Sequence, residues 1–417
     1  MIPLYNGFVY LMWFVVTFYM VFIVLSIIVY KEKIFAKPNM KMDRNPFVTL
    51  LIPAYNEEAD VAETLKSLHK VSYKNVEFLF LNDGSKDKTS EIITKHVKAL
   101  RAKGDMRFRF IDNKINKGKA ATLNQGIALA KGEYVACMDA DTVVEKNIFQ
   151  KVIPEFHTKN IAAVTVAVEV SNKRKWLNKV IGVEFNLGLG LLLRVFSFSG
   201  VVWVTPGPFS MYRKYVLDEI GGFDPNSITE DHEIAFRIYK AGYVISNTMN
   251  AKVWATMPET FKGSYIQRRR WYSGSIITML QHRKMLAKPK YGLFSFFIPY
   301  NMILIFLSLI MFGSTVGLAL VKIVKNIILF SHTGFNFFAH WSWDYSLFYL
   351  GRVNILGFLM FAMVVVFIAV GLTASKVQFR KNAFGILLFP FFFFLYQIYW
   401  WGAVISTITK GGKIKWR

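Results

Sequence analysis

Residues 47–57 read FVTLLIPAYNE, an apolar run that ends in three polar residues. The run Phe47–Ala54 has the length and composition of a buried strand. Segments of strand and helix character then alternate along the chain. The expected strands after the first are Val76–Leu81, Phe108–Ile111 and Tyr134–Met138, and the expected helices are Asp60–His69, Asp87–Arg101 and Lys119–Lys131. This alternation predicts an α/β domain with a mostly parallel, doubly wound sheet.

Polar residues stand at the carboxyl ends of the expected strands, which is where sheets of this type bind ligands. Tyr55 and Glu57 follow the first strand, Asp83 the second, and Asp139 and Asp141 the fourth. Alternate carboxylates at a strand end can bind Mg²⁺ or Mn²⁺, with diphosphate oxygens completing the shell, although a solvated acidic turn has the same pattern. Asp83 strengthens the site because it can accept hydrogen bonds from a uracil or a ribose.

Two more charged clusters are candidates for the same chemistry. Lys117–Lys119 precedes an expected helix and can attract phosphate; the alternative is a solvated basic turn. The run Thr229-Glu230-Asp231 offers a carboxylate as general base for an acceptor hydroxyl. It also suits the first turn of a helix with Thr229 as N-cap, and the two roles are compatible.

The run Gln267–Trp271, QRRRW, combines three arginines with an aromatic ring just before an apolar segment. Adjacent arginines can bind a diphosphate, and Trp271 offers a flat face for a sugar ring. The alternative is a basic and aromatic anchor at a membrane interface.

Composition points to a membrane rather than to nucleic acid. The 417 residues carry a formal net charge of +24, and 53% of them are hydrophobic. The basic residues flank apolar runs, which favours anionic lipid headgroups as their partner and predicts no nucleic acid. The single cysteine, Cys137, excludes an internal disulfide and a cysteine metal cluster.

Four apolar runs are long enough to span a bilayer. They are Phe8–Tyr30, Tyr291–Val321, Val353–Ser375 and Asn382–Thr409. Basic residues directly after the first run place the following domain in the cytoplasm. Four spans would put the basic tail Lys410–Arg417 outside, against the same rule. Either the last run, interrupted by Pro390, does not fully cross, or Asn326–Leu350 holds another crossing.

The segment Lys173–Ser199 differs from the other helices of the domain. Apolar side chains recur on one helical face, and basic residues cluster at its start. This pattern predicts a helix in the membrane interface, and an ordinary core helix is the alternative. The domain boundaries expected are a first span and basic segment (1–45), a cytoplasmic domain with interfacial helices (46–285) and a C-terminal membrane region of about three spans (286–417).

The ordered set of motifs resembles the family 2 inverting, membrane-embedded polysaccharide synthases, which make cellulose, chitin, hyaluronan and poly-N-acetylglucosamine. The matching pieces are Pro53-Ala54-Tyr55-Asn56-Glu57, Asn82-Asp83-Gly84-Ser85, Lys117-Gly118-Lys119-Ala120 with Leu123-Asn124, Asp139-Ala140-Asp141, Gly207-Pro208-Phe209-Ser210, Thr229-Glu230-Asp231 and Q-x-x-R-W at Gln267–Trp271. Pro206 departs from the pattern of several relatives, which have Ser there. Motif details point to different sugars, so the resemblance leaves the sugar open.

The resemblance implies a nucleotide-sugar-binding glycosyltransferase domain between transmembrane helices of the plasma membrane. It implies a nucleotide donor, usually UDP-linked, a divalent metal (Mg or Mn), and a growing glycan acceptor threaded across the lipid bilayer. By the same likeness, the roles are as follows: Asp231, with Glu230, is catalytic; Tyr55, Glu57, Asp83, Lys119, Asp139 and Arg270 bind the nucleotide; Asp139 and Asp141 bind the metal; and Gly207, Phe209, Gln267 and Trp271 meet the acceptor.

Two other functions compete with a processive synthase. A transferase that adds one sugar to a polyprenyl phosphate or other lipid acceptor would keep the metal site and need no channel. A transporter or scaffold would leave Asp139, Asp141 and Asp231 without a role. The Q-x-x-R-W run beside an interfacial helix favours the processive synthase.

Overall fold

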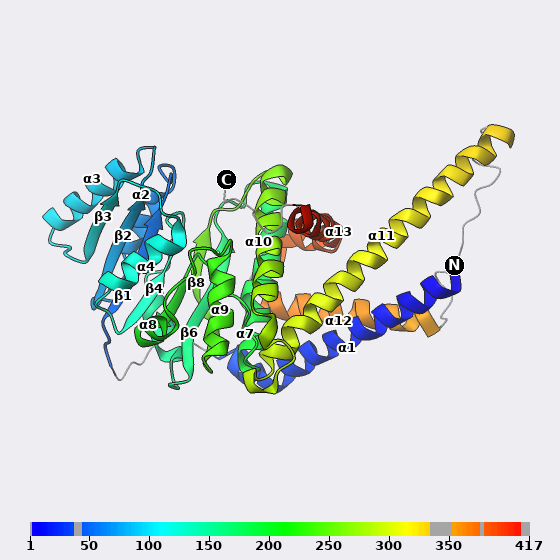
Figure 1. Ribbon diagram of the computed structural model, residues 1–417, viewed down its shortest axis with the longest axis horizontal. Helices are drawn as coiled ribbons and strands as arrows, with labels where there is room; N and C mark the ends of the chain where they lie inside the picture. The colour runs from blue at the N-terminus through cyan, green and yellow to red at the C-terminus, as the bar shows by residue number, and fades with distance from the viewer. Residues whose placement is uncertain (1, 37–43, 334–351, 376–378, 410–417) are drawn as a thin grey trace. The chain divides into compact units, whose positions relative to one another are not determined.

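The computed structural model describes residues 2–36, 44–333, 352–375 and 379–409 (Figure 1). The chain forms two compact units. A sheet unit consists of Tyr30–Ile298 and Gly371–Arg417, and a helical unit consists of Met1–Val29 and Pro299–Val370.

The sheet unit is built on eight strands in the order β3-β2-β1-β4-β7-β6-β8-β5. The strands are β1 (Val48–Ala54), β2 (Val76–Asp83), β3 (Phe108–Asn113), β4 (Tyr134–Cys137), β5 (Val143–Val144), β6 (Ile161–Val170), β7 (Ser210–Arg213) and β8 (Val244–Ala255). The first four strands are parallel, as expected. The sheet as a whole is mixed, because β7 runs antiparallel to both β4 and β6, and β5 runs antiparallel to β8.

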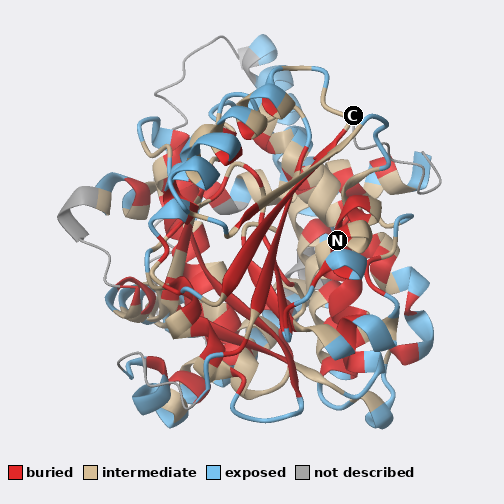
Figure 2. Ribbon diagram, turned by 90° about the vertical axis from the view of Figure 1, so that its left-hand side faces the viewer, coloured by how far each residue is buried: buried red, intermediate tan, exposed pale blue. Residues whose placement is uncertain are grey.

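The inner strands are buried, which explains their apolar sequences. All eight residues of β2 are buried, and six of the seven in β1 are. Strands covered on both faces need apolar side chains at every position rather than at alternate ones (Figure 2). The register pairs Ala54 with Asn82 and Asp83 with Asn113. The polar residues that follow these strands therefore start from one edge of the sheet.

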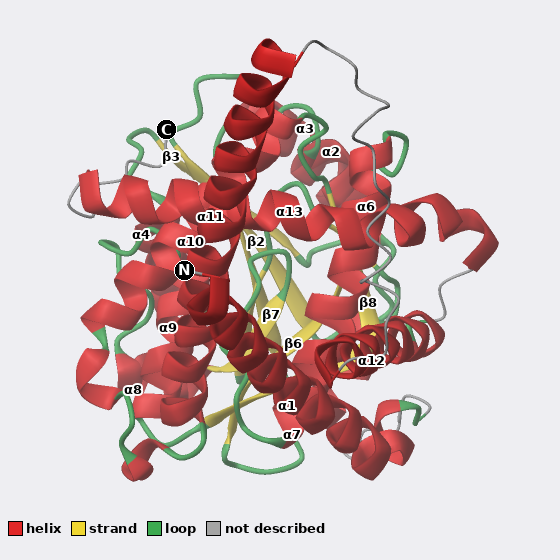
Figure 3. Cartoon of the chain, turned by 90° about the vertical axis from the view of Figure 1, so that its right-hand side faces the viewer, coloured by secondary structure: helices red, strands yellow, loops and turns green. Residues whose placement is uncertain are grey.

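Helices flank the strands of the sheet unit (Figure 3). They are α2 (Val61–His69), α3 (Thr89–Ala102), α4 (Lys119–Leu129), α5 (Ile148–Val152), α6 (Trp176–Phe185), α7 (Leu193–Phe198), α8 (Lys214–Ile220), α9 (Glu230–Lys240), α10 (Phe261–Gln281) and α13 (Phe379–Thr409). The helices expected from the sequence coincide with α2, α3 and α4 to within two residues at each end.

The segment expected to lie in the membrane interface forms α6, a π-helical stretch (Asn186–Leu192) and α7. Val180 and Leu191 of its apolar face are completely buried, whereas Trp176 at its start is 43% exposed. The segment packs against β6, β8 and α13. These are the contacts of a core helix, the alternative interpretation, and the interfacial location stays a prediction.

The long apolar helices are α1 (Ile2–Ile34), α11 (Phe294–Thr333) and α12 (Arg352–Ala374). Among the described helices, the segments that could cross a membrane by length and composition are Gly7–Ile34, Trp176–Phe198, Phe294–Leu329 and Gly357–Ala374. The last predicted span lies in α13, which bends by 50° between Phe392 and Phe394. Most of the possible extra crossing, residues 334–350, and the basic tail lie outside the described residues.

Candidate active site

Asp139 lies two residues after the end of β4 and against the backbone of Gly207. The Asp139 amide donates a hydrogen bond to the Gly207 carbonyl oxygen at 3.2 Å. A Cβ on Gly207 would stand 2.7 Å from Asp139 Oδ2 and 2.9 Å from Lys119 Nζ. A larger residue at position 207 would therefore displace the ends of the Asp139 and Lys119 side chains from their present positions.

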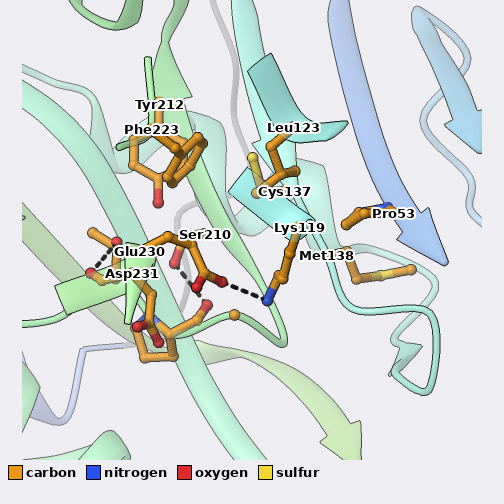
Figure 4. Close-up of a pocket in the computed structure, with 13 residues that line it drawn as sticks. Pro53, Lys119, Leu123, Cys137, Met138, Ser210, Tyr212, Phe223, Glu230 and Asp231 are labelled. Carbon is orange, nitrogen blue, oxygen red and sulfur yellow. Dashed lines mark hydrogen bonds and ion pairs between the residues drawn. The ribbon is translucent and has the colours of Figure 1, made fainter. Parts of the chain in front are cut away.

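Lys119 joins two acidic residues that are far apart in sequence. It is the first residue of α4, and its Nζ lies 2.6 Å from Asp139 Oδ1. The same Nζ lies 2.9 Å from Glu230 Oε1 (Figure 4). Burial favours the neutral amine, but the charges of Asp139 and Glu230 outweigh it and hold the pKa of Lys119 well above its usual value. Lys119 is therefore a fixed positive charge at the carboxyl edge of the sheet.

Glu230 and Asp231 are the first two residues of α9, and their surroundings shift their pKa values in opposite directions. Burial alone would raise the pKa of Glu230, but the charge of Lys119 lowers it. Burial and the charge of Glu230 raise the pKa of Asp231 to about 6. Because a base works best when its pKa lies near the working pH, Asp231 is better suited to accept a proton than Glu230.

The backbone around Asp231 is held by the loop that precedes Gly207. Thr205 donates two hydrogen bonds to the Asp231 carbonyl oxygen, from its amide at 3.0 Å and from its hydroxyl at 2.8 Å. The side-chain Oδ1 of Asp231 accepts from the His232 amide at 2.9 Å. Asp231, Glu230, Lys119 and Gly207 line one small cavity. The structure thus brings together four of the residues expected at the site.

Asp139 and Asp141 are the candidate ligands of a divalent metal. Burial and the charge of Asp139 raise the pKa of Asp141 to about 7, so this carboxylate gains from a nearby cation. No group of three or more His, Cys, Asp or Glu side chains is gathered for a metal among the described residues. Two carboxylates with the remaining ligands from substrate phosphates are a usual set for Mg²⁺, so the residues fit such an ion.

Asp83 organises the loop in front of α4. Its two carboxylate oxygens accept hydrogen bonds from the amides of Lys117 at 2.8 Å and Gly118 at 2.9 Å. On the neighbouring strand, Tyr55 is 37% exposed, and the Glu57 amide donates to the Thr89 hydroxyl at 2.8 Å. Both loops are thereby tied to the starts of helices, and the ring of Tyr55 remains accessible.

Helix α10 brings the Q-x-x-R-W run to the start of α9. A Cβ on Gly274 would stand 2.9 Å from Thr229 Cβ, so the Thr229 side chain packs directly against the backbone of α10. Arg270 Nη1 lies 3.5 Å from the Ile228 carbonyl oxygen, and its charge acts on Asp231. Thr229 is at the N-cap position of α9 as expected, but its side chain makes no capping hydrogen bond.

Phe209, which was expected to meet the acceptor, lies in the core of the sheet unit. Its side chain is completely buried, and its ring packs against Phe149 with a centroid distance of 6.1 Å. A fully enclosed side chain cannot contact an acceptor sugar, so Phe209 belongs to the core. It follows Gly207 on the way into β7, and its apolar character reflects that strand.

Sequence reasoning did not identify Glu184 as a residue of interest. It is the only acidic residue of Trp176–Phe198, and it pairs with Arg268 of the Q-x-x-R-W run. A lone carboxylate in an apolar helix was the available signal, because such a charge needs a buried partner.

Comparison with known proteins shows what this chain is similar to. Residues 49–221 match the model of the family described as glycosyl transferase family 2. Poly-beta-1,6-N-acetyl-D-glucosamine synthase of Staphylococcus aureus (strain COL) is 33% identical over 255 residues, which are 61% of this chain and 60% of that protein. The same enzyme of Staphylococcus epidermidis is 33% identical over 244 residues, 58% of each chain. The match thus spans about three fifths of the length of these curated relatives.

A solved structure supports the fold. The mannosyltransferase PcManGT from Pyrobaculum calidifontis, in complex with GDP-Man and Mn2+, superposes with a TM-score of 0.57. It is 16% identical, and the match covers 86% of this chain and 98% of that chain. Residues 49–221 of the sheet unit are therefore similar to family 2 glycosyltransferases, and over about three fifths of its length the chain is similar to poly-beta-1,6-N-acetyl-D-glucosamine synthases.

Proposed function

We propose that the chain is a processive, inverting glycosyltransferase that polymerises a sugar from a UDP-sugar, such as UDP-GlcNAc or UDP-Glc, into a β-linked polysaccharide. The observation that carries the proposal is the cluster at the sheet edge, where Lys119 bridges Asp139 and Glu230 beside Asp231. The names of the similar synthases favour UDP-GlcNAc as donor and a poly-N-acetylglucosamine as product.

Asp231 is the proposed base. In an inverting displacement, the acceptor hydroxyl attacks the sugar carbon on the side opposite the leaving diphosphate, and its proton must go to a nearby group. The raised pKa of Asp231 suits this transfer, and the two hydrogen bonds from Thr205 fix its backbone. Glu230 is the proposed partner of Lys119, which keeps a second negative charge in place beside the base.

The leaving diphosphate would be bound by positive charges already in place. Lys119 lies at the N-terminus of α4, and Arg270 acts on the same region from α10. Asp139 and Asp141 would hold Mg or Mn, which when bound stabilises negative charge on the diphosphate. Both residues follow β4, so the proposed metal site and the proposed base share one edge of the sheet.

The nucleotide and acceptor sites are proposed on either side of this cluster. Tyr55 and Glu57 follow β1, and they would hold the nucleotide together with Asp83. Gly207, Gln267 and Trp271 would meet the end of the growing glycan. Gly207 leaves room beside Asp139, and Trp271 lies on α10 one residue after Arg270.

The proposed location is the plasma membrane, with the sheet unit in the cytoplasm and the glycan passing across the bilayer. The apolar helices Gly7–Ile34, Phe294–Leu329 and Gly357–Ala374 support this proposal through their length and composition. Donor nucleotide-sugars are cytoplasmic, so the basic residues after α1 agree with the same orientation.

The test is to incubate membranes containing the full chain with a panel of radiolabelled nucleotide sugars and to size the products. We expect a ladder or a long polymer with UDP-GlcNAc and equimolar release of UDP. A single added sugar on a lipid extractable into organic solvent would instead show the single-addition transferase. Absence of transfer from every donor, in membranes where the chain is folded, would refute the glycosyltransferase assignment.

A further inference from the structure

Glu184 and Arg268 form a buried ion pair that the reaction described above does not use. Arg268 Nη1 lies 2.5 Å from Glu184 Oε1, and Arg268 Nη2 lies 2.7 Å from Oε2. The Arg268 side chain is 4% exposed and the Glu184 side chain 14%. A two-pronged contact of this kind fixes the plane of the guanidinium group as well as its position.

The fixed guanidinium lies over the ring of Trp271. The Arg268 Cζ is 4.7 Å from the centroid of the Trp271 ring and 5.6 Å from that of Phe185. A guanidinium at this distance from an indole face is attracted by the ring and favours one ring orientation. Arg268 therefore connects a carboxylate on α6 to the aromatic ring that is proposed to hold the acceptor sugar.

Residues of α13 contact both Glu184 and the segment that carries Trp271. Tyr396 of α13 is a further hydrogen-bond partner of Glu184. Tyr272, the residue after Trp271, stacks on Trp400 of α13 with a centroid distance of 4.3 Å. Helices α6, α10 and α13 all belong to the sheet unit, so the supports of Trp271 form part of the same packed body.

We propose that Glu184 is a positioning residue for the acceptor, which acts by fixing Arg268 and thereby the ring of Trp271. This inference rests on the proposed function, because it assigns Glu184 to retention of the growing glycan between additions. A polymer that must slide by one sugar after each transfer needs an apolar face that keeps its orientation. The buried pair holds that face without contacting the sugar.

The test uses the full chain in membranes and compares polymer length with UDP release. We expect Glu184→Gln to shorten the product strongly and to reduce polymer yield by up to about 10²-fold, since misplacement by an ångström has effects of this size. UDP binding and release of free sugar from the donor should stay near wild type. In a Trp271→Ala background, Glu184→Gln should shorten the product no further, because Glu184 acts through Trp271.

A reciprocal exchange separates positioning from simple cross-linking of helices. Glu184→Arg combined with Arg268→Glu restores the ion pair but places a carboxylate under Trp271. We expect this double variant to regain the thermal stability lost in the single variants and to keep making short products. Recovery of both stability and product length would overturn the proposal, because the pair would then be only a cross-link.

The chain supplies a matched control in Arg194 and Glu155. These residues form a similar pair at 2.9 Å with side chains 11% and 18% exposed, and the Arg194 guanidinium also lies over a ring, that of Phe198. Glu155→Gln should leave product length unchanged. An equal shortening in Glu155→Gln, or a normal product from Glu184→Gln, would refute the role of Glu184. If wild-type membranes transfer no sugar, the proposed function fails instead.

Discussion

Asp231 is the residue whose surroundings most directly predict a measurable property. Its pKa is raised to about 6, so the group holds its proton at pH 5 and loses it above pH 6. Only the carboxylate can accept the proton of the acceptor hydroxyl. We expect kcat/KM for polymer formation to rise by about tenfold per pH unit below pH 6 and to level off above it, as for a single essential base. A pH-independent rate between pH 4.5 and 8 would contradict this role.

Replacement of the base gives the second prediction at this scale. Asp231→Asn should lower transfer by about 10² to 10⁴-fold while UDP binding is preserved, because the amide keeps the shape of the side chain but cannot act as a base. UDP affinity is measured on the same membranes by equilibrium binding. If that affinity collapses with the rate, Asp231 contributes to donor binding or to the structure of α9 and not to proton transfer.

The proposed metal is tested through Asp141. Asp141→Ala should abolish both polymer formation and donor hydrolysis and leave the protein folded, since the negative charge of the diphosphate would lack its counterion. Chelation with EDTA should have the same effect on the wild type, reversed by added Mg²⁺ or Mn²⁺. Full transfer in excess EDTA would contradict the assignment of Asp139 and Asp141 to a metal.

At the scale of elements, the close crossing of α9 and α10 controls the distance between base and arginine. Gly274→Ala would push a methyl group into Thr229 Oγ1 and Cγ2. We expect a loss of stability of about 1–3 kcal/mol, typical of overpacking, together with a fall in transfer rate. Thr229→Ala in the same chain should restore part of both, because it removes the two closest atoms but leaves the Cβ at 2.9 Å, and the Thr229 hydroxyl has no hydrogen-bond partner in the described structure to lose.

Thermal unfolding and transfer rate are the two measurements for this prediction. Gly188→Ala is the control, since a Cβ at Gly188 would meet nothing within 4 Å. An unaltered Gly274→Ala enzyme would show that the two helices can separate without cost and that their contact does not set the geometry of the site.

The parts of the fold that the sequence predicts are those set by local pattern. β1–β4 and α2–α4 follow from apolar runs and helical periodicity over short windows. The direction of β7 does not, because a four-residue strand carries no signal for its partners, β4 and β6. The same holds for the site. The polar ends of β2 and β4 are visible in the sequence, whereas Lys119 meets Glu230 only when the chain has folded, because the two residues are far apart in sequence.

At the scale of the whole chain, charge and hydropathy agree with the proposed membrane enzyme, whose candidate site lies in one unit. Asp344 is the only acidic residue after Glu259 in the sequence. The carboxylates are therefore concentrated in the sheet unit. The basic residues are also concentrated there, because the helical unit contains only three of them, Lys322, Lys325 and Arg352. The helical unit is therefore poor in charge of either sign, as expected of a part that meets lipid.

Cys137 has a practical consequence. It is the only cysteine of the 417 residues, it is buried, and it lines the cavity beneath Lys119. Burial raises the pKa of its thiol, and Lys119 only partly opposes this, so little thiolate is available for alkylation. The rate at which a thiol reagent modifies Cys137 therefore reports whether the reagent can reach the cavity at the carboxyl edge of the sheet. A maleimide should label native membranes slowly and denatured ones fully, with Cys137→Ala as the blank. Fast labelling of folded protein would reveal that this edge opens spontaneously, which no activity measurement detects.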